Sequence, residues 1–508
     1  MHQQQPRHQS KSRRRNTHHI HNKLSKLDRT LRHHARQLPL VIPPDHEFWE
    51  RVHNARRQGD TESTPAVPES KPKPFSWAAV LKTGLNTNGT SASKGTSANG
   101  HSDTFYDDYH AAKQRTFQSL EDALESWKLV FTAPPVQPRG LVNSGNMCFM
   151  NVVLQALLYC APFYNLLWGV KASVAFSFKA TTPLLEALIQ YVHEFKHDRT
   201  PLAKMITDLD EPFVPENVYE ALRKKNVFQT LRGQQEDAQE FMSYLVDGIN
   251  EEISTILSAH RLSTSLANGA VVSPGASDNS SWLEVGHHNK AMHIRDSNEA
   301  ATKTPITQIF GGSLQSTLDV PGAIFGTKGN KAPRSSNREA FQWLALDVSS
   351  DGVETIEDAF DQFVAPETIE GYMNLRGESV TATKQILLER VPPVLVLHLK
   401  RFVFCPNEGV QKVHKFIEYP ANLSLAAKWF AKTAEAAQHK NAKYKLSGVI
   451  YHHGEQASGG HYTCDLVRSA NEWLRFDDVD IDCLSSIDDA LAKKKDRTAY
   501  ILFYTICH

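Results

Sequence analysis

The chain has 508 residues, enough for two or three average domains or for one large domain with extensions, because single cores rarely grow past roughly 250 to 300 residues. Its composition is 40% hydrophobic and 22% charged, and its formal net charge of zero argues against a chain that binds nucleic acid or a membrane surface over its whole length. Six cysteines without a C-x-x-C pair provide no tetrathiolate zinc site and favour a reducing compartment over a disulfide scaffold.

The first 104 residues are predicted to form a disordered extension. Residues 1–60 are rich in Arg, Lys and His, and residues 61–104 have the Ser, Thr, Gly, Asn and Pro composition of a linker. We expect a solvated basic tail, with an RNA contact or a nuclear import signal as the alternative functions. The apolar sequence PFSWAAVLK within the linker is a candidate motif for binding a regulatory protein. No apolar segment follows the basic start, so no secretory signal is predicted.

A glycine- and asparagine-rich turn leads directly into an apolar, helix-forming segment at residues 140–163, GLVNSGNMCFMNVVLQALLYCAPF. Residues 143–146 are of the kinds that form turns and N-caps, so Cys148 is expected at or near the first turn of the helix. A helix N-terminus stabilises a thiolate, the reactive form of cysteine. By itself the pattern leaves two interpretations open, because most cysteines in such helices are small core residues, and Cys160 is interpreted as one.

The apolar run of residues 152–170 approaches the ~20 residues that span a bilayer. Gln155, Pro162 and Asn165 interrupt it, so the sequence predicts a buried helix followed by a turn, and no membrane insertion.

The middle of the chain predicts a long amphipathic helix that begins near Gln235, because four apolar residues recur at every fourth position. A polar, small-residue insertion is expected at about residues 255–304. Short apolar or alternating strands then follow, in an order that suggests an α+β domain with two lobes and a cleft between them. The four helix residues are Phe241, Leu245, Ile249 and Ile253.

A histidine that could act as a base for the thiol lies near the C-terminus of the chain. His461 follows Gly459 and Gly460 at the start of a strand, and glycines without side chains would let a substrate backbone pass close to the imidazole. His452 and His453, at the end of the preceding strand, are expected to line the loop.

An antiparallel hairpin centred near Ala470 brings Asp477 and Asp478 back to His461. Strand alternation sends the two aspartates to opposite faces, so only one of them can hold the imidazole. The same alternation places Cys464 on the face opposite His461, which removes the nearest rival thiol.

These residues match the requirements of acyl transfer. His461 would take the proton of Cys148 and later protonate a leaving amine, while the aspartate fixes its tautomer. The side-chain amide of Asn143 and the backbone N–H of Cys148 could stabilise the oxyanion, and loss of such a donor typically costs ~10²- to 10³-fold in rate.

Three blocks of the sequence are similar to one enzyme family. GLVNSGNMCFMNVVLQALL resembles the cysteine box of the ubiquitin-specific proteases, GQQEDAQEFMSYLVD their second block, and YHHGEQASGGHYTCDL with WLRFDDVDI their histidine box. The similarity covers about residues 136–506 and is greatest to the subtype numbered ten in animals and its fungal relatives. It implies a papain-like cysteine protease core with thumb, palm and fingers subdomains.

The resemblance also implies roles for single residues. It makes Cys148 the nucleophile, His461 the base, Asp477 the triad aspartate and Asn143 the oxyanion donor, with Asp478 as a supporting residue.

Contacts with ubiquitin are implied for a second group of residues. Asp237 and Glu240 match carboxylates that hold the basic tail of ubiquitin, although a solvated helix face is the alternative for Glu240. Gly459, Gly460 and Tyr462 would line the path of the tail.

The sequence thus predicts a thiol-dependent deubiquitinating enzyme of the cytoplasm, with the nucleus as a further location. It would act on ubiquitin and ubiquitinated proteins and need no cofactor or metal. A catalytically silent ubiquitin-binding scaffold, and a protease for another ubiquitin-like protein, are the alternative functions.

Overall fold

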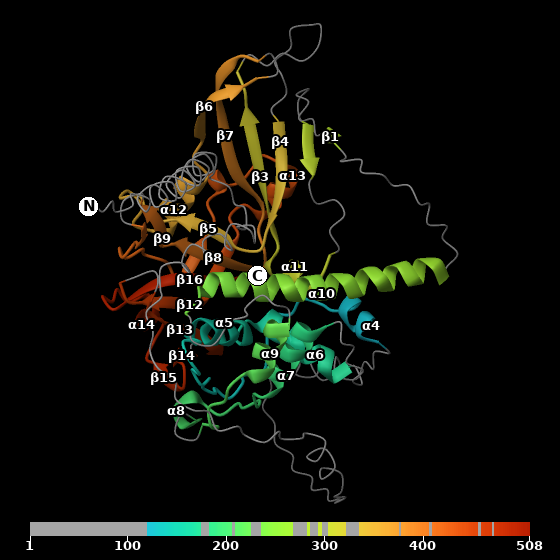
Figure 1. Ribbon diagram of the computed structural model, residues 1–508, viewed down its shortest axis with the longest axis vertical. Helices are drawn as coiled ribbons and strands as arrows, with labels where there is room; N and C mark the ends of the chain where they lie inside the picture. The colour runs from blue at the N-terminus through green and yellow to red at the C-terminus, as the bar shows by residue number, and fades with distance from the viewer. Residues whose placement is uncertain are drawn as a thin grey trace, which may run out of the picture. The chain divides into compact units, whose positions relative to one another are not determined.

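Helices come first along the chain and strands dominate its second half, as the sequence pattern predicts for an α+β domain (Figure 1). The predicted extension of residues 1–104 lies outside the described residues. The computed structural model describes residues 119–173, 182–205, 209–224, 235–267, 282–284, 293–296, 303–321, 335–374, 377–405, 409–455, 459–469 and 472–507.

Seven helices precede the strands in the described part of the chain, and we call them the helical lobe. They pack on one another through α5, α6, α7 and α10. Their bounds are α4 (Leu120–Glu125), α5 (Cys148–Leu158), α6 (Ala161–Ser173), α7 (Pro183–His193), α8 (Leu202–Met205), α9 (Glu216–Lys224) and α10 (Ala238–Ala267).

The larger sheet has the strand order β15-β14-β13-β12-β16-β8-β5, and β11 pairs with β12 at its side. The strands predicted for the second half of the chain lie in this sheet as β8, β12, β13, β14 and β16, except that the end of the first predicted stretch forms β9 (Phe402–Cys405) outside it. β13 and β14 form the predicted antiparallel hairpin, in which Cys464 lies opposite Phe476. The bounds are β5 (Leu344–Asp347), β8 (Val394–Lys400), β11 (Asn422–Ser424), β12 (Lys443–His453), β13 (His461–Ser469), β14 (Glu472–Asp477), β15 (Asp480–Leu484) and β16 (Arg497–Ile506).

A second sheet projects from the first in Figure 1 and has the order β1-β2-β4-β3-β7-β6. A separate two-stranded ribbon is formed by β9 (Phe402–Cys405) and β10 (Gly409–Lys412). The strands of the second sheet are β1 (Trp282–Glu284), β2 (His293–Asp296), β3 (Gly312–Asp319), β4 (Ser335–Phe341), β6 (Glu367–Met373) and β7 (Ser379–Arg390). Short helices connect these parts: α11 (Pro305–Phe310), α12 (Ile356–Phe363), α13 (Ala434–His439) and α14 (Asp488–Leu491).

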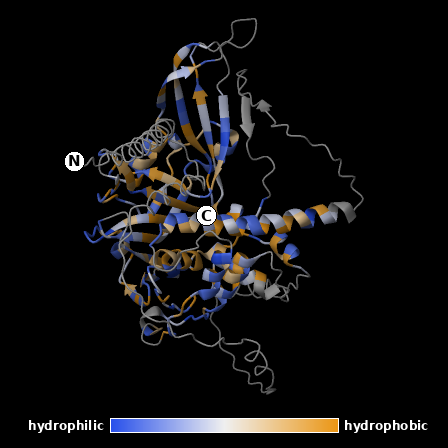
Figure 2. Cartoon of the chain, in the orientation of Figure 1, coloured by the Kyte–Doolittle hydropathy of each residue, from blue (hydrophilic) through white to orange (hydrophobic). Residues whose placement is uncertain are grey.

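Helix α5 lies between the rest of the helical lobe and the larger sheet. All of its residues are buried, and it contacts β12, β13 and β14 as well as α6 and α10. Its apolar composition, which is plain in Figure 2, suits a helix that is enclosed on every side. The buried helix and the turn after it are confirmed, but a second helix, α6, begins at Ala161 and includes Pro162 and Asn165, which were predicted to interrupt the run.

Among the described residues no single helix is long and apolar enough to cross a membrane. Helix α5 and the part of α6 that ends at Val170 reach that length and apolar composition only when they are taken together. The two helices are bent by 82° relative to each other.

The long helix α10 confirms the predicted amphipathic pattern, because Phe241, Leu245, Ile249 and Ile253 are fully buried. Its N-terminus lies at Ala238, slightly later than predicted, because Asp237 caps it: Oδ1 of Asp237 accepts the N–H of Gln239 at 2.7 Å and of Glu240 at 3.1 Å.

The prediction that the insertion begins at about residue 255 is wrong, because α10 continues to Ala267. Leu257 is 1% exposed and extends the packed face beyond the predicted boundary. Further along, Arg261 forms an ion pair of 3.2 Å with Glu125 of α4. Packing against α4 therefore continues the helix through a sequence whose polar composition predicts a loop.

Candidate active site

Cys148 is the first residue of α5, in agreement with the prediction that it lies at a helix start. The preceding turn has left-handed backbone at Gly145 (φ 97°) and Asn146 (φ 58°), two residue types that tolerate this conformation. The predicted polar N-cap is wrong, since the cap is Met147 and its side chain makes no capping bond. The N–H of Met147 instead donates to Oδ1 of Asn143 at 2.7 Å, which ties the turn to the helix.

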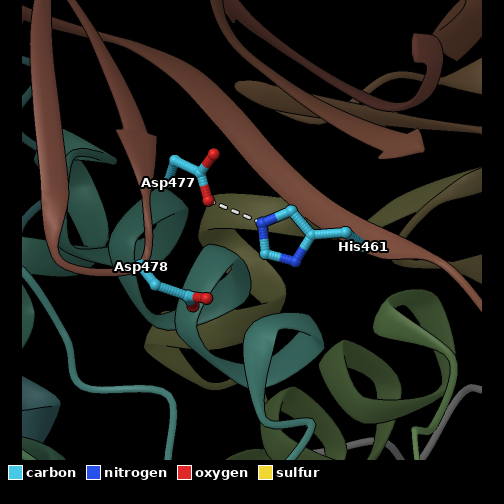
Figure 3. Close-up of side chains that lie close together, drawn as sticks. All are labelled: His461, Asp477 and Asp478. Atoms are coloured by element: carbon cyan, nitrogen blue, oxygen red, sulfur yellow. Dashed lines mark hydrogen bonds and ion pairs between the residues drawn. The ribbon is translucent and has the colours of Figure 1, made fainter. Parts of the chain in front are cut away.

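His461 is the first residue of β13 and joins Cys148 to Asp477. Its Nε2 lies 2.6 Å from Oδ1 of Asp477 (Figure 3), which leaves Nδ1 as the ring nitrogen for the thiol. The hydrogen bond with Cys148 is the main cause that raises the pKa of His461 to about 9; burial opposes the shift, and Asp477 adds to it. An imidazole of this pKa keeps its proton at neutral pH.

Asp478 has different partners from its neighbour. One carboxylate oxygen accepts a hydrogen bond from Nδ2 of Asn143, and the other accepts one from Nδ2 of Asn151, both at 2.8 Å. The left-handed backbone of Asp478 (φ 52°) turns the side chain away from the direction of Asp477. As predicted, only one aspartate bonds to the imidazole, and it is Asp477. The predicted reason, strand alternation, is wrong, because Asp478 lies in the turn after β14.

The glycines before His461 differ in how tightly they pack. A Cβ atom on Gly460 would lie 2.2 Å from the carbonyl oxygen of His453 and 2.7 Å from Nε2 of His452, whereas Gly459 has nothing within 4 Å of its Cβ position. The N–H of Gly460 donates to Oε1 of Gln235 at 2.9 Å. This bond joins the histidine loop directly to the segment that precedes α10.

A buried lysine holds the same loop from the other side. Nζ of Lys412, on the β9–β10 ribbon, donates to the carbonyl oxygens of His452 at 3.2 Å and Gly454 at 2.7 Å. Lys412 is 8% exposed, and its burial together with the nearby Arg401 lowers its pKa to about 8. The backbone that leads to His461 is therefore fixed at two points.

The rival groups around the site are ill suited to chemistry. Cys464 is fully buried, and its burial raises the pKa of the thiol. His452 is 1% exposed, and burial lowers its pKa to about 3, so it stays neutral. Nε2 of His453 bonds with Oγ1 of Thr463 at 2.8 Å. Both histidines thus shape the loop, as the sequence predicts.

The residues predicted to contact ubiquitin have distinct surroundings. Asp237 caps α10 and accepts the hydroxyl of Tyr500 at 2.5 Å, and burial raises its pKa, so a structural role already occupies its carboxylate. Tyr462 is 2% exposed, and its burial favours a structural role over a side-chain contact with a partner. Glu240 is half-buried in the first turn of α10.

A metal ion is another occupant to consider for these groups. Within the described ranges, one ligand atom each of His461, Asp477 and Asp478 lies within 4.8 Å of the others. The imidazole bonds to Asp477, and both oxygens of Asp478 accept amide hydrogens, so hydrogen bonds within the protein account for the closeness of the three groups.

Three polar residues of the site were missed by sequence reasoning. Asn151 was hidden within the apolar run, although a buried polar residue in such a helix is itself a signal. Gln235 and Lys412 contact the histidine loop from segments distant in the sequence, and no local pattern reveals such contacts.

Comparisons with known proteins place the chain in a family. The family model described as ubiquitin carboxyl-terminal hydrolase matches residues 139–504. The chain is 35% identical over 507 residues to the probable ubiquitin carboxyl-terminal hydrolase 3 of Schizosaccharomyces pombe, covering 92% of this chain and 94% of that protein. It is 32% identical to ubiquitin carboxyl-terminal hydrolase 10 of Gallus gallus, covering 76% of this chain and 51% of the chicken protein, so it spans about half the length of that relative.

Among solved structures, the chain resembles a SAGA DUB module that contains Ubp8 and is bound to ubiquitin aldehyde. The TM-score is 0.53 at 22% identity, and the match covers 75% of this chain and 72% of that one. At this identity the likeness concerns the fold.

Proposed function

Because the chain belongs to the ubiquitin carboxyl-terminal hydrolase family, we propose that it is a thiol-dependent deubiquitinase with Cys148, His461 and Asp477 as its catalytic triad. The observation that carries the proposal is that one imidazole bonds to Asp477 and has its pKa raised chiefly by Cys148. Cys148 lies at the start of a helix, and Asp477 lies on the strand next to that of His461. This is the arrangement that activates a cysteine nucleophile.

In the proposed reaction the thiolate of Cys148 attacks the carbonyl carbon of the last glycine of ubiquitin. The carbonyl π electrons move to the oxygen, and the amide of Asn143 with the backbone N–H of Cys148 stabilises the oxyanion. His461 then gives its proton to the leaving amine, the C–N bond breaks, and a ubiquitinyl thioester remains. His461 next accepts a proton from water, whose oxygen attacks the thioester and releases ubiquitin and the thiol.

The substrate class is supported by the loop beside the imidazole. Gly459 has open space at its Cβ position, and Gly460 lies directly before the base, so an extended chain without bulky side chains could reach the thiol along this loop. The C-terminal Gly-Gly of ubiquitin meets this steric requirement. The relative in the solved complex is bound to ubiquitin aldehyde, which agrees with this assignment.

Hydrolysis of a fluorogenic ubiquitin C-terminal amide tests the proposal, with Cys148→Ser as the matched inactive variant. We expect turnover by the wild type and none by Cys148→Ser. A folded wild type that binds ubiquitin without turnover would indicate the scaffold function instead. Amides of other ubiquitin-like proteins with a Gly-Gly end distinguish the second alternative, since faster hydrolysis of one of them would reassign the substrate.

The N-terminal extension and the location of the protein stay predictions. Binding of RNA by residues 1–104 is tested by deleting them and measuring the salt dependence of RNA binding, because contacts with phosphates weaken as salt rises. Loss of RNA binding on deletion would support the RNA contact, and unchanged binding would reject it.

A further inference from the structure

Asn151 is a polar residue in an otherwise apolar stretch of α5, one helical turn after Cys148. It is 2% exposed. Its Nδ2 donates to Oδ1 of Asp478 at 2.8 Å and to the carbonyl oxygen of Leu141 at 3.3 Å. Its own Oδ1 has no hydrogen-bond partner within the described part of the chain. Asn151 therefore acts as a hydrogen-bond donor at this position, through the two N–H groups of its amide.

We propose that Asn151 is a positioning residue that orients the oxyanion donor Asn143 by fixing the carboxylate of Asp478. The inference rests on the proposed function and adds a residue to it. The shorter of its two hydrogen bonds goes to Asp478, and the longer one goes to the backbone of Leu141, so the route through Asp478 is tested below by a double substitution.

The carboxylate of Asp478 is fixed from two directions. Asn151 binds one oxygen and Asn143 the other, and the backbone carbonyl of Asp478 accepts the N–H of Leu141 at 2.9 Å. With both oxygens bonded, rotation of the carboxylate would break a hydrogen bond. The buried amide of Asn151 thus fixes the carboxylate of Asp478, and the carboxylate in turn orients the exposed amide of Asn143.

Asn143 is exposed, so its side chain is held mainly by the hydrogen bonds of this network. Its Nδ2 donates to Asp478, and its Oδ1 accepts the N–H of Met147 at 2.7 Å. An amide nitrogen carries two hydrogens, so the second hydrogen of Nδ2 can point to a substrate oxygen while the first stays bonded to Asp478.

The charge of Asp478 makes the donation from Asn151 more important. A carboxylate close to a developing oxyanion repels it, and the repulsion is smaller when amide donors compensate the charge of the carboxylate. Without Asn151, one oxygen of Asp478 would lose its buried donor and would be free to turn toward the reaction centre.

The test compares Asn151→Leu with Gln155→Leu. Gln155 is a matched control because it lies one turn further along α5, is also 2% exposed, and donates to a carbonyl oxygen, that of Arg139, at 2.8 Å. We expect Asn151→Leu to lower kcat for the ubiquitin amide roughly 10- to 100-fold with KM within about twofold, and Gln155→Leu to change kcat less than about threefold.

If Asn151 only stabilised the fold, its replacement would lower kcat and the reactivity of the Cys148 thiol together. Alkylation of Cys148 by iodoacetamide, followed by mass spectrometry of its peptide, needs the thiolate but forms no oxyanion. We therefore expect the same alkylation rate in the wild type and Asn151→Leu. A parallel fall in both rates would overturn the inference, because it would show that α5 or the thiol had moved.

The Asn151→Asp variant keeps the size of the side chain and decides the question if Asn151→Leu does not fold. A carboxyl group at this position can donate to Asp478 only when protonated, so its activity relative to the wild type should rise as pH falls. Thermal unfolding is followed for every variant. A flat activity ratio across the pH range would contradict the proposal.

A double substitution tests the route of the effect. If Asn151 acts through Asp478, adding Asn151→Leu to Asp478→Ala should reduce kcat no further than Asp478→Ala alone. Additive losses would overturn the inference, as would a folded Asn151→Leu with the kcat of Gln155→Leu. No turnover by the wild type would overturn the proposed function and the inference together, so the two failures are distinct.

Discussion

Oδ1 of Asp477 lies 2.6 Å from Nε2 of His461, whereas the carboxylate of the adjacent Asp478 bonds to Asn143 and Asn151. Two neighbouring carboxylates at the end of one hairpin therefore serve different groups. The left-handed backbone of Asp478 causes the separation, since it redirects the second side chain. The hairpin thus connects both to the base and to the loop that precedes the nucleophile.

The first prediction concerns the alkaline limb of the pH profile. A thiolate–imidazolium pair loses activity as pH rises through the pKa of His461, which is raised to about 9, chiefly by the hydrogen bond with Cys148 and further by Asp477. Asp477→Asn removes one of the raising causes, so the limb should move to lower pH. The measurement is kcat/KM between about pH 6 and 10.

The control for this profile is Asp480→Asn, because Asp480 is the cross-strand neighbour of Asp477 and is exposed. Its alkaline limb should match that of the wild type. An unshifted limb in Asp477→Asn would show that Asp477 does not support the charge of the imidazole.

The same raised pKa also affects stability. The charged form of His461 stabilises the folded state at pH values below the ordinary pKa of histidine, and this contribution to the free energy of unfolding is lost as pH rises toward 9.

The second prediction concerns the close packing of Gly460. Gly460→Ala would put a methyl group 2.2 Å from the carbonyl oxygen of His453, so the loop before His461 must move. We expect a loss of roughly 100-fold or more in kcat/KM, as for misplaced catalytic groups. Gly352→Ala is the control, because nothing lies within 4 Å of its Cβ position, and its activity should equal that of the wild type. An active Gly460→Ala enzyme would indicate that the loop adopts another conformation in solution.

The third prediction concerns a buried cap in the helical lobe. Glu252 of α10 is 6% exposed and accepts the backbone N–H groups of Leu184 at 3.2 Å and Leu185 at 2.9 Å, at the N-terminus of α7. Glu252→Ala should lower the free energy of unfolding by about 2 kcal/mol, because it leaves the helix N-terminus without an acceptor. Glu251→Ala, at the exposed neighbouring position, should change it by less than about 0.5 kcal/mol. Urea unfolding measures both, and equal midpoints would contradict the assigned role.

The fourth prediction concerns the contact of Glu240 with the substrate. If its carboxylate meets the basic tail of ubiquitin, Glu240→Gln should raise KM several-fold and leave kcat unchanged, since the interaction is equally strong in the ground and transition states. The difference in KM between the two enzymes should shrink as salt is added. A fall in kcat at constant KM would instead give Glu240 a role in organising the active site.

The sequence predicts the elements of the fold better than their extent. Strands β8, β12, β13, β14 and β16 follow from short apolar or alternating runs, and the buried face of α10 follows from its four-residue period, because both patterns reflect local burial. The C-terminal part of α10 does not, because it packs on α4, a helix far away in the sequence. Tertiary contacts of this kind extend a helix through polar residues.

The site shows the same division. The hairpin that pairs His461 with Asp477 is predictable from strand alternation and a short turn. The contacts of Asn151 with Asp478 and of Gln235 with Gly460 join segments that are distant in the chain, so only the folded structure reveals them. The burial of Tyr462 likewise depends on how β13 packs, which the resemblance between sequences does not specify.

The central claim is that Cys148 is the nucleophile that forms a thioester with ubiquitin. It is tested most directly with ubiquitin that carries a C-terminal electrophile, followed by mass spectrometry of the modified peptide. We predict a single covalent adduct on Cys148, its loss in Cys148→Ser, and slower labelling in His461→Ala. An adduct on Cys464 or another cysteine, or labelling that persists in Cys148→Ser, would contradict the assignment.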